Sequence, residues 1–126
     1  MQIQSEQRAS PRIQVTIPVK LICSNEKTFV AQINSLNEQG FLCSMKKSLP
    51  LQTPVRIIML IPPTEEARPR QSAVVTGEGI VIRENIKENL EGDLGHAVAI
   101  QFTNLISDDS SRLKAFIKYY SNKNLN

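Results

Sequence analysis

The chain of 126 residues has few of the residue types from which catalytic, metal-binding and base-stacking sites are usually built. It contains one histidine, two cysteines and no tryptophan, and aromatic residues make up 5% of the sequence. A zinc site needs about three or four protein ligands, and neither a Cys-x-x-Cys pair nor a Cys/His cluster is present to supply them. We therefore expect no metal site. A surface that stacks the bases of single-stranded nucleic acid is also disfavoured.

Long apolar stretches are missing as well. The longest apolar run covers residues 57–61, whereas a membrane-spanning helix needs about 20 consecutive apolar residues. Residues 1–7 are polar and contain no hydrophobic segment of the kind that signal peptides carry. We therefore expect a cytoplasmic protein that does not insert into a membrane.

The overall composition is that of a folded domain. Hydrophobic residues make up 40% and charged residues 21%, and the length suits one hydrophobic core. The net charge is +3, but the first 63 residues carry seven Lys or Arg against three Asp or Glu. This cationic half favours an anionic partner, although the excess is too small to predict binding to duplex nucleic acid.

Six short stretches have the apolar alternation or apolar density that is typical of strands. Pro18 in the first stretch indicates an edge or a bulge, and Gly77 and Gly79 in the fifth indicate a bulge or a bend. Residues 84–93 are expected to form an acidic connection. The stretches expected to form strands are 13–21, 29–33, 41–43, 55–61, 73–82 and 97–102.

The C-terminal residues change to a helical pattern. Ser107 or Asp108 can cap a helix, and apolar residues then recur at positions 113, 116, 117 and 120, on one helical face. The fold class expected is therefore mainly all-β, a six-stranded antiparallel barrel with a C-terminal α-helix. Residues 1–12 are expected to be a flexible N-terminal arm, and residues 13–122 a single domain.

Motifs of catalysis are missing from the sequence. It contains no GxSxG turn and no Walker motif, and the glycines at 77 and 79 lack the third glycine of a dinucleotide-binding loop. His96 follows Gly95 at the start of a strand, which is typical of a structural or surface histidine. We therefore predict no catalytic residues and no enzyme activity.

Two arginines stand immediately before the first predicted strand. Arg8 and Arg12 frame the segment 8–12, which reads RASPR and is stiffened by Pro11. A guanidinium group presents a planar fork of donors that fits phosphate oxygens and also the O6/N7 edge of guanine. Two such forks suit a compact anionic purine ligand, although the same spacing also fits two solvated arginines on a tail.

A polar segment, 35–40, lies between the second and third predicted strands and reads SLNEQG. Ser35 and Asn37 are two residues apart, so their side chains are expected on the same side of an extended chain. Gly40 ends the segment, as a tight turn with positive φ requires. The segment also fits an ordinary polar hairpin turn.

This order of elements is similar to that of PilZ domains, bacterial receptor modules for cyclic di-GMP with a six-stranded antiparallel barrel and a C-terminal helix. Their signature combines an RxxxR arm before the first strand with a [D/N]xSxxG turn after the second. Residues 8–12 match the arm, and Gly40 with the following Phe41 and Leu42 matches the end of the turn. Residues 79–83 and 97–102 also resemble the family, and the similarity covers roughly residues 7–120.

The resemblance implies a ligand and a role for each residue of the two motifs. Arg8 and Arg12 would bind phosphate and guanine edges, Ser35 and Asn37 would make polar contacts with guanine, and Gly40 would shape the turn. The turn departs from the family pattern, because Ser35 stands where the family has Asp or Asn, and Asn37 stands where it has Ser. The implied ligand is cyclic di-GMP, with no cofactor.

Two functions follow from the resemblance. The first is a non-catalytic receptor that binds cyclic di-GMP and signals through an effector protein, which the intact RxxxR arm favours. The alternative is a degenerate adaptor that binds no nucleotide and acts by protein–protein interaction, for example in pilus or motility machinery, which the altered turn favours. A barrel that binds single-stranded nucleic acid is a third, weaker reading, given the scarcity of aromatic residues.

Overall fold

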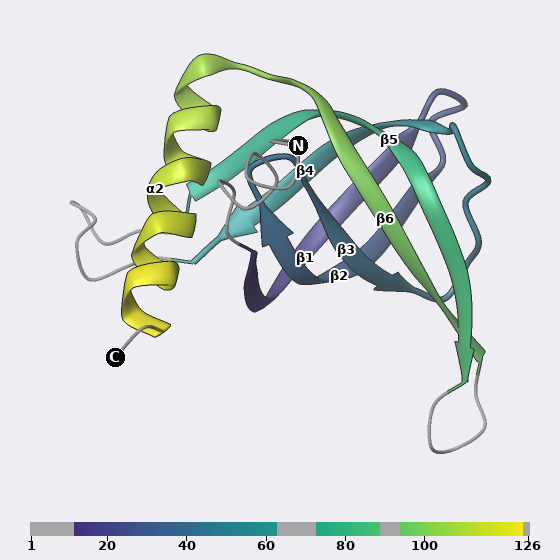
Figure 1. The fold of residues 1–126 in the computed structure, drawn as a ribbon. Coiled ribbons are helices and arrows are strands. Elements are labelled where there is room, and N and C mark those ends of the chain that lie inside the picture. Colours follow the sequence, from purple (N-terminus) through teal and green to yellow (C-terminus); the bar gives the residue numbers. More distant parts are fainter. Residues whose placement is uncertain (1–11, 63–72, 89–93, 125–126) are drawn as a thin grey trace, which may run out of the picture.

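A computed structural model describes residues 12–62, 73–88 and 94–124 (Figure 1). In this part of the chain, six strands are followed by one helix. Their bounds are β1 Ile13–Cys23, β2 Thr28–Asn37, β3 Gly40–Met45, β4 Pro54–Ile61, β5 Ala73–Glu88, β6 Leu94–Leu105 and α2 Ser107–Asn124.

The six strands form a closed barrel in the order β1-β2-β3-β6-β5-β4, and β4 pairs with β1 to complete it. Every neighbouring pair is antiparallel. Closure removes the open sheet edges that would otherwise present unpaired backbone groups. The predicted fold, a six-stranded antiparallel barrel with a C-terminal helix, is confirmed.

Alternation along the strands produces the barrel core. In β1 the side chains of Ile17, Val19 and Leu21 are buried, while the residues between them are exposed. The ring of Phe41 on β3 packs edge-on against the ring of Phe102 on β6, with centroids 5.7 Å apart. Burial of each large apolar side chain contributes about 1.5–3 kcal/mol, and this buried set fixes which face of each strand points inward.

Helix α2 lies beside one end of the barrel (Figure 1) and buries its apolar stripe there. Leu113, Phe116 and Ile117 are all buried, as the helical spacing predicted. A buried carboxylate also attaches the helix to β5, through Asp109 and Thr76. The C-terminal residues that the sequence assigned to a helix therefore pack against this end of the barrel.

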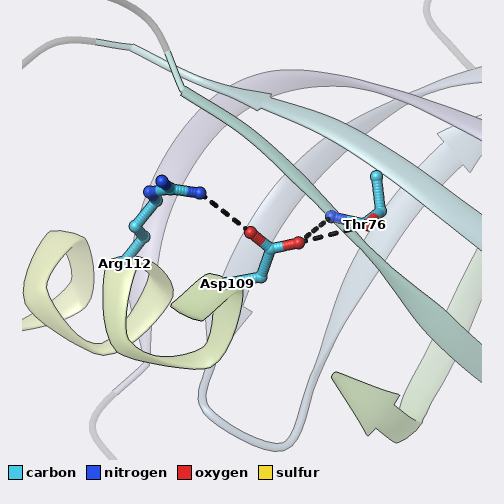
Figure 2. A network of polar contacts seen from close by, with 3 residues as sticks. All are labelled: Thr76, Asp109 and Arg112. Carbon is cyan, nitrogen blue, oxygen red and sulfur yellow. Dashed lines mark hydrogen bonds and ion pairs between the residues drawn. The ribbon is translucent and has the colours of Figure 1, made fainter. Parts of the chain in front are cut away.

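The attachment of α2 to β5 lies just beyond the point where β5 stops pairing with β6. Pairing of β5 with β6 ends where Gly77 lies opposite Leu105. One residue further along β5, Oδ2 of Asp109 accepts the backbone N–H of Thr76 at 3.0 Å and its hydroxyl at 3.1 Å, while Oδ1 accepts Nη1 of Arg112 at 3.0 Å (Figure 2). The carboxylate thus satisfies an amide that β6 no longer reaches.

The strands are longer than the sequence predicted, most of all β2, β5 and β6. The acidic connection expected over residues 84–93 is wrong in part, because β5 continues to Glu88 and pairs with β6 as far as Leu94. These two strands extend past their other neighbours (Figure 1), since β4 pairs with β5 only as far as Ile80. Likewise β2 continues to Asn37, which leaves only residues 38–39 as the turn before β3.

Bulges occur near the residues that signalled them. Register shifts lie between Gln14 and Ile17 in β1 and between Glu78 and Gly79 in β5. Pro18 follows the first shift, and pairing of β1 with β4 is recorded only from Val19 onward. The prediction of irregular pairing near Pro18 and Gly79 is therefore confirmed. The other interpretation of Pro18, that β1 is an edge strand of an open sheet, is wrong because the barrel is closed.

Candidate functional site

Buried polar side chains are few in the described part of the chain, and two of them lie near the end of β2. Ser35, Asn37 and Asp109 are the buried polar or charged residues there, with exposed fractions of 5%, 8% and 4%. Asp109 anchors the helix. Ser35 and Asn37 belong instead to the segment that the sequence singled out as a binding turn, so this end of the β1–β2 hairpin is the candidate site.

Arg12 reaches this site directly. Its Nη1 donates a hydrogen bond to Oγ of Ser35 at 2.9 Å, across 23 positions of sequence. The contact follows from the register of the hairpin, in which Gln14 lies opposite Ser35 and Ile13 opposite Leu36. The structure therefore brings together one arginine of the RxxxR motif and one residue of the altered turn.

The charge of Arg12 is not neutralised by any described carboxylate. Within the described residues, the carboxylate of Asp109 pairs with Arg112 and that of Glu84 lies near His96, and neither carboxylate contacts Arg12. Arg12 is exposed and its recorded partner is the neutral hydroxyl of Ser35. A guanidinium held by a neutral acceptor keeps its full charge for an anionic ligand.

Asn37 closes the turn with its own side chain. Its Oδ1 accepts the backbone N–H of Gln39 at 2.8 Å and that of Gly40 at 3.0 Å. Such side-chain-to-backbone bonds are a standard way for asparagine to stabilise a turn. The carbonyl oxygen of Asn37 therefore serves the backbone, and the amide nitrogen is the part of this side chain left to face a ligand.

Gly40 is needed for a different reason from the one expected. Its backbone is not left-handed, because it is the first residue of β3 and pairs with both Asn37 and Gln101. A Cβ added at this position would lie 2.1 Å from the backbone oxygen of Ile100 on β6. The prediction of a positive φ is wrong, and close approach of β3 to β6 explains the glycine.

Arg8 and residues 1–11 of the predicted arm lie outside the described residues. The roles given to Arg8, and the proposed flexibility of the arm, therefore stay predictions. Of the five predicted site residues, Arg12, Ser35, Asn37 and Gly40 lie near one end of the β1–β2 hairpin.

A second polar contact was missed because its acidic member was expected in a loop. Glu84 is a strand residue of β5, and its Oε2 accepts the backbone N–H of Leu49 at 3.2 Å. The same oxygen lies 3.3 Å from Nδ1 of His96. The bond from Leu49 links the 46–53 connection to β5, whereas Nδ1 of His96 is buried and has no hydrogen-bond partner among the described residues.

Burial raises the pKa of the Cys43 thiol to about 12, so this cysteine stays protonated and is no nucleophile at neutral pH.

Within the described ranges, no cluster of three or more His, Cys, Asp or Glu side chains is placed to bind a metal ion. In the same ranges, no helix has the length and apolar character needed to cross a bilayer.

Comparison with solved structures shows the same fold at low sequence identity. The inhibitor of motility MotI/DgrA of Bacillus subtilis is similar with a TM-score of 0.71 and 14% identity, over 93% of this chain and 51% of that chain. MrkH of K. pneumonia in its apo state is similar with a TM-score of 0.70 and 12% identity, over 90% of this chain and 50% of that chain. This chain therefore spans about half the length of both proteins.

A third structure matches over nearly its full length. The PilZ domain of YcgR from Escherichia coli, solved with c-di-GMP, has a TM-score of 0.65 and 11% identity, and the match covers 93% of each chain. A search of curated proteins gave no match. Identities this low show that this chain shares the fold of these proteins.

The family model described as "PilZ domain" matches residues 6–119, well over half of the chain. PilZ domains are non-catalytic receptor modules for cyclic di-GMP, which agrees with the expectation that the chain is not an enzyme. With the barrel order and the helix already described, this match identifies the chain as a member of the PilZ domain family.

Proposed function

We propose that this chain binds cyclic di-GMP at the end of the β1–β2 hairpin and passes the signal to an effector protein in the cytoplasm. The observation that carries the proposal is the contact between Arg12 and Ser35. It joins the two family motifs at one place and leaves the positive charge of Arg12 without a described carboxylate partner.

The chemistry of the ligand fits these residues. A guanidinium group has five N–H donors, and among the described residues Ser35 takes one from Arg12, so in this proposal the others bind phosphate oxygens or O6 and N7 of guanine. Arg8 of the RxxxR motif supplies the second fork in this proposal. Ser35 and Asn37 contribute short polar contacts, and Gly40 keeps β3 close enough to β6 to hold the turn in place.

Signalling requires a change of surface, since a non-catalytic domain makes no product. In our proposal the ligand orders the N-terminal arm, residues 1–12, against the barrel. An order–disorder change of this kind creates or hides a surface for an effector protein. Neither duplex nucleic acid nor membrane insertion is part of the proposed function.

The alternative is an adaptor that binds no nucleotide. It is favoured by the two departures in the turn, because Ser35 and Asn37 are buried and already form hydrogen bonds within the chain. In that case the site is a structural element, and Arg12 only ties the start of β1 to β2.

Titration calorimetry of the whole chain with cyclic di-GMP separates the two functions, with GTP and cyclic AMP as control ligands. The receptor proposal expects saturable binding of cyclic di-GMP and none of comparable strength for the controls. A folded protein that gives no binding signal with cyclic di-GMP would reject the receptor function and leave the adaptor.

A further inference from the structure

The Arg12–Ser35–Asn37 cluster has spare hydrogen-bond donors but very few spare acceptors. The carbonyl oxygen of Asn37 accepts two backbone N–H groups, those of Gln39 at 2.8 Å and Gly40 at 3.0 Å. An amide carbonyl has two lone pairs, so both are in use. What Asn37 still offers a ligand is its amide nitrogen Nδ2, which only donates.

The other two members have the same bias. Arg12 is exposed and has donors alone. Oγ of Ser35 already accepts Nη1 of Arg12 at 2.9 Å, and the side chain belongs to a residue that is only 5% exposed. One lone pair of this neutral, covered hydroxyl is therefore the last acceptor that the three side chains hold.

Guanine presents two chemically different edges to such a cluster. O6 and N7 accept hydrogen bonds, whereas N1–H and the 2-amino group donate them. A carboxylate at position 35 would accept both donors and would also pair with Arg12, but the hydroxyl of Ser35 does neither. A donor-rich cluster instead matches O6, N7 and the phosphoryl oxygens.

Resting on the proposed function, we infer that this cluster recognises the acceptor groups of the nucleotide and does not read the 2-amino group of guanine. Ser35 is then the residue that sets this specificity. Its hydroxyl positions Arg12 without neutralising the guanidinium charge. It also provides no carboxylate to accept the 2-amino group, which guanine has and hypoxanthine lacks.

The test is calorimetry of the full chain with three cyclic dinucleotides. Cyclic di-IMP has hypoxanthine bases, which keep O6 and N7 but lack the 2-amino group, and we expect its Kd to lie within about threefold of that of cyclic di-GMP. Cyclic di-AMP carries an amino donor in place of O6, and we expect it to bind at least about tenfold more weakly.

The variant Ser35→Asp should create the missing discrimination. With a carboxylate present, cyclic di-GMP should bind roughly tenfold more tightly than cyclic di-IMP. The ratio of the two dissociation constants within one variant is the readout, because any effect of the new charge on overall affinity applies to both ligands. Ser24→Asp is the matched control, since it adds the same charge in the turn at the opposite end of the β1–β2 hairpin, and its ratio should stay near that of the parent.

Glu38 needs its own control, because it is an exposed carboxylate next to Asn37 in the turn. Glu38→Gln should leave the ratio unchanged. A parent protein that binds cyclic di-IMP about tenfold more weakly than cyclic di-GMP would overturn the inference, and loss of that difference in Glu38→Gln would assign the acceptor to Glu38. Failure of the folded parent to bind any of the three ligands would instead overturn the proposed function.

Discussion

At the scale of single residues, the candidate site depends on side chains that serve the fold and the ligand together. Asn37 shows this most clearly, because its Oδ1 holds two backbone N–H groups of the turn. Its Nδ2 remains the only part that our proposal assigns to recognition. Substitutions at such positions therefore need a stability measurement beside every binding measurement.

Replacement of Asn37 should show how much its side-chain oxygen stabilises the turn. Asn37→Ala removes the acceptor of two buried or half-buried N–H groups and should lower the free energy of unfolding by about 1–3 kcal/mol. Asn37→Ser, which has the residue of the family motif, keeps a short side-chain acceptor and should cost less. Urea unfolding of both variants checks this, and equal losses would contradict the role of the side-chain oxygen in the turn.

Gly40 should tolerate no side chain. A Cβ here would lie 2.1 Å from the backbone oxygen of Ile100, so Gly40→Ala forces β3 and β6 apart and should cost about 1–3 kcal/mol of stability. The exposed neighbour Gln39 provides a control, since Gln39→Ala should change stability by about 0.5 kcal/mol or less. A Gly40→Ala protein with the thermal midpoint of the parent would show that the strands are not so closely packed.

Sequence reasoning located these residues but did not determine how they interact. The motif spacing identified Arg12 and Ser35 separately, whereas their contact depends on the register of β1 against β2. That register is set by buried side chains from the whole barrel, which no local pattern contains. The close approach that requires Gly40 was not predicted either, because it involves β6, which begins more than 50 positions later in the sequence.

At the scale of elements, periodicity predicted those strands whose two faces differ in polarity. β1 and the stripe of α2 were predicted well, because one face of each is apolar and buried. The end of β5 was not, because charged residues such as Glu84, Lys87 and Glu88 gave it the composition of a loop. It is a strand because β6 pairs with it as far as Leu94.

The attachment of α2 gives a prediction at this scale. Asp109→Ala leaves the backbone N–H of Thr76 and its hydroxyl without their acceptor, and should lower the free energy of unfolding by about 1–3 kcal/mol. Asp108→Ala is the control, because it removes the same charge from the same turn of the helix at an exposed position.

Hydrogen exchange locates the effect of the Asp109 substitution. The amide of Thr76 should lose protection in Asp109→Ala and keep it in Asp108→Ala. Unchanged protection of Thr76 in both variants would mean that burial of Leu113, Phe116 and Ile117 alone holds the helix against the barrel.

At the scale of the whole molecule, the closed barrel places a cation beside a polar turn. The register of β1 against β2 places Arg12 beside Ser35, with its charge free of described carboxylates. The cationic first half of the sequence and the PilZ family membership point to the same kind of ligand, an anionic nucleotide. Our central claim is that Arg12 binds it.

Calorimetric titration of cyclic di-GMP into Arg12→Ala and Arg56→Ala, compared with the parent, tests this claim most directly. Both variants lose one exposed arginine, but Arg56 lies on β4, outside the candidate site. Loss of a charge-assisted contact costs about 1.5–3 kcal/mol, so Arg12→Ala should bind roughly 10- to 150-fold more weakly, while Arg56→Ala binds as the parent does. Equal affinity of Arg12→Ala and the parent would contradict the claim.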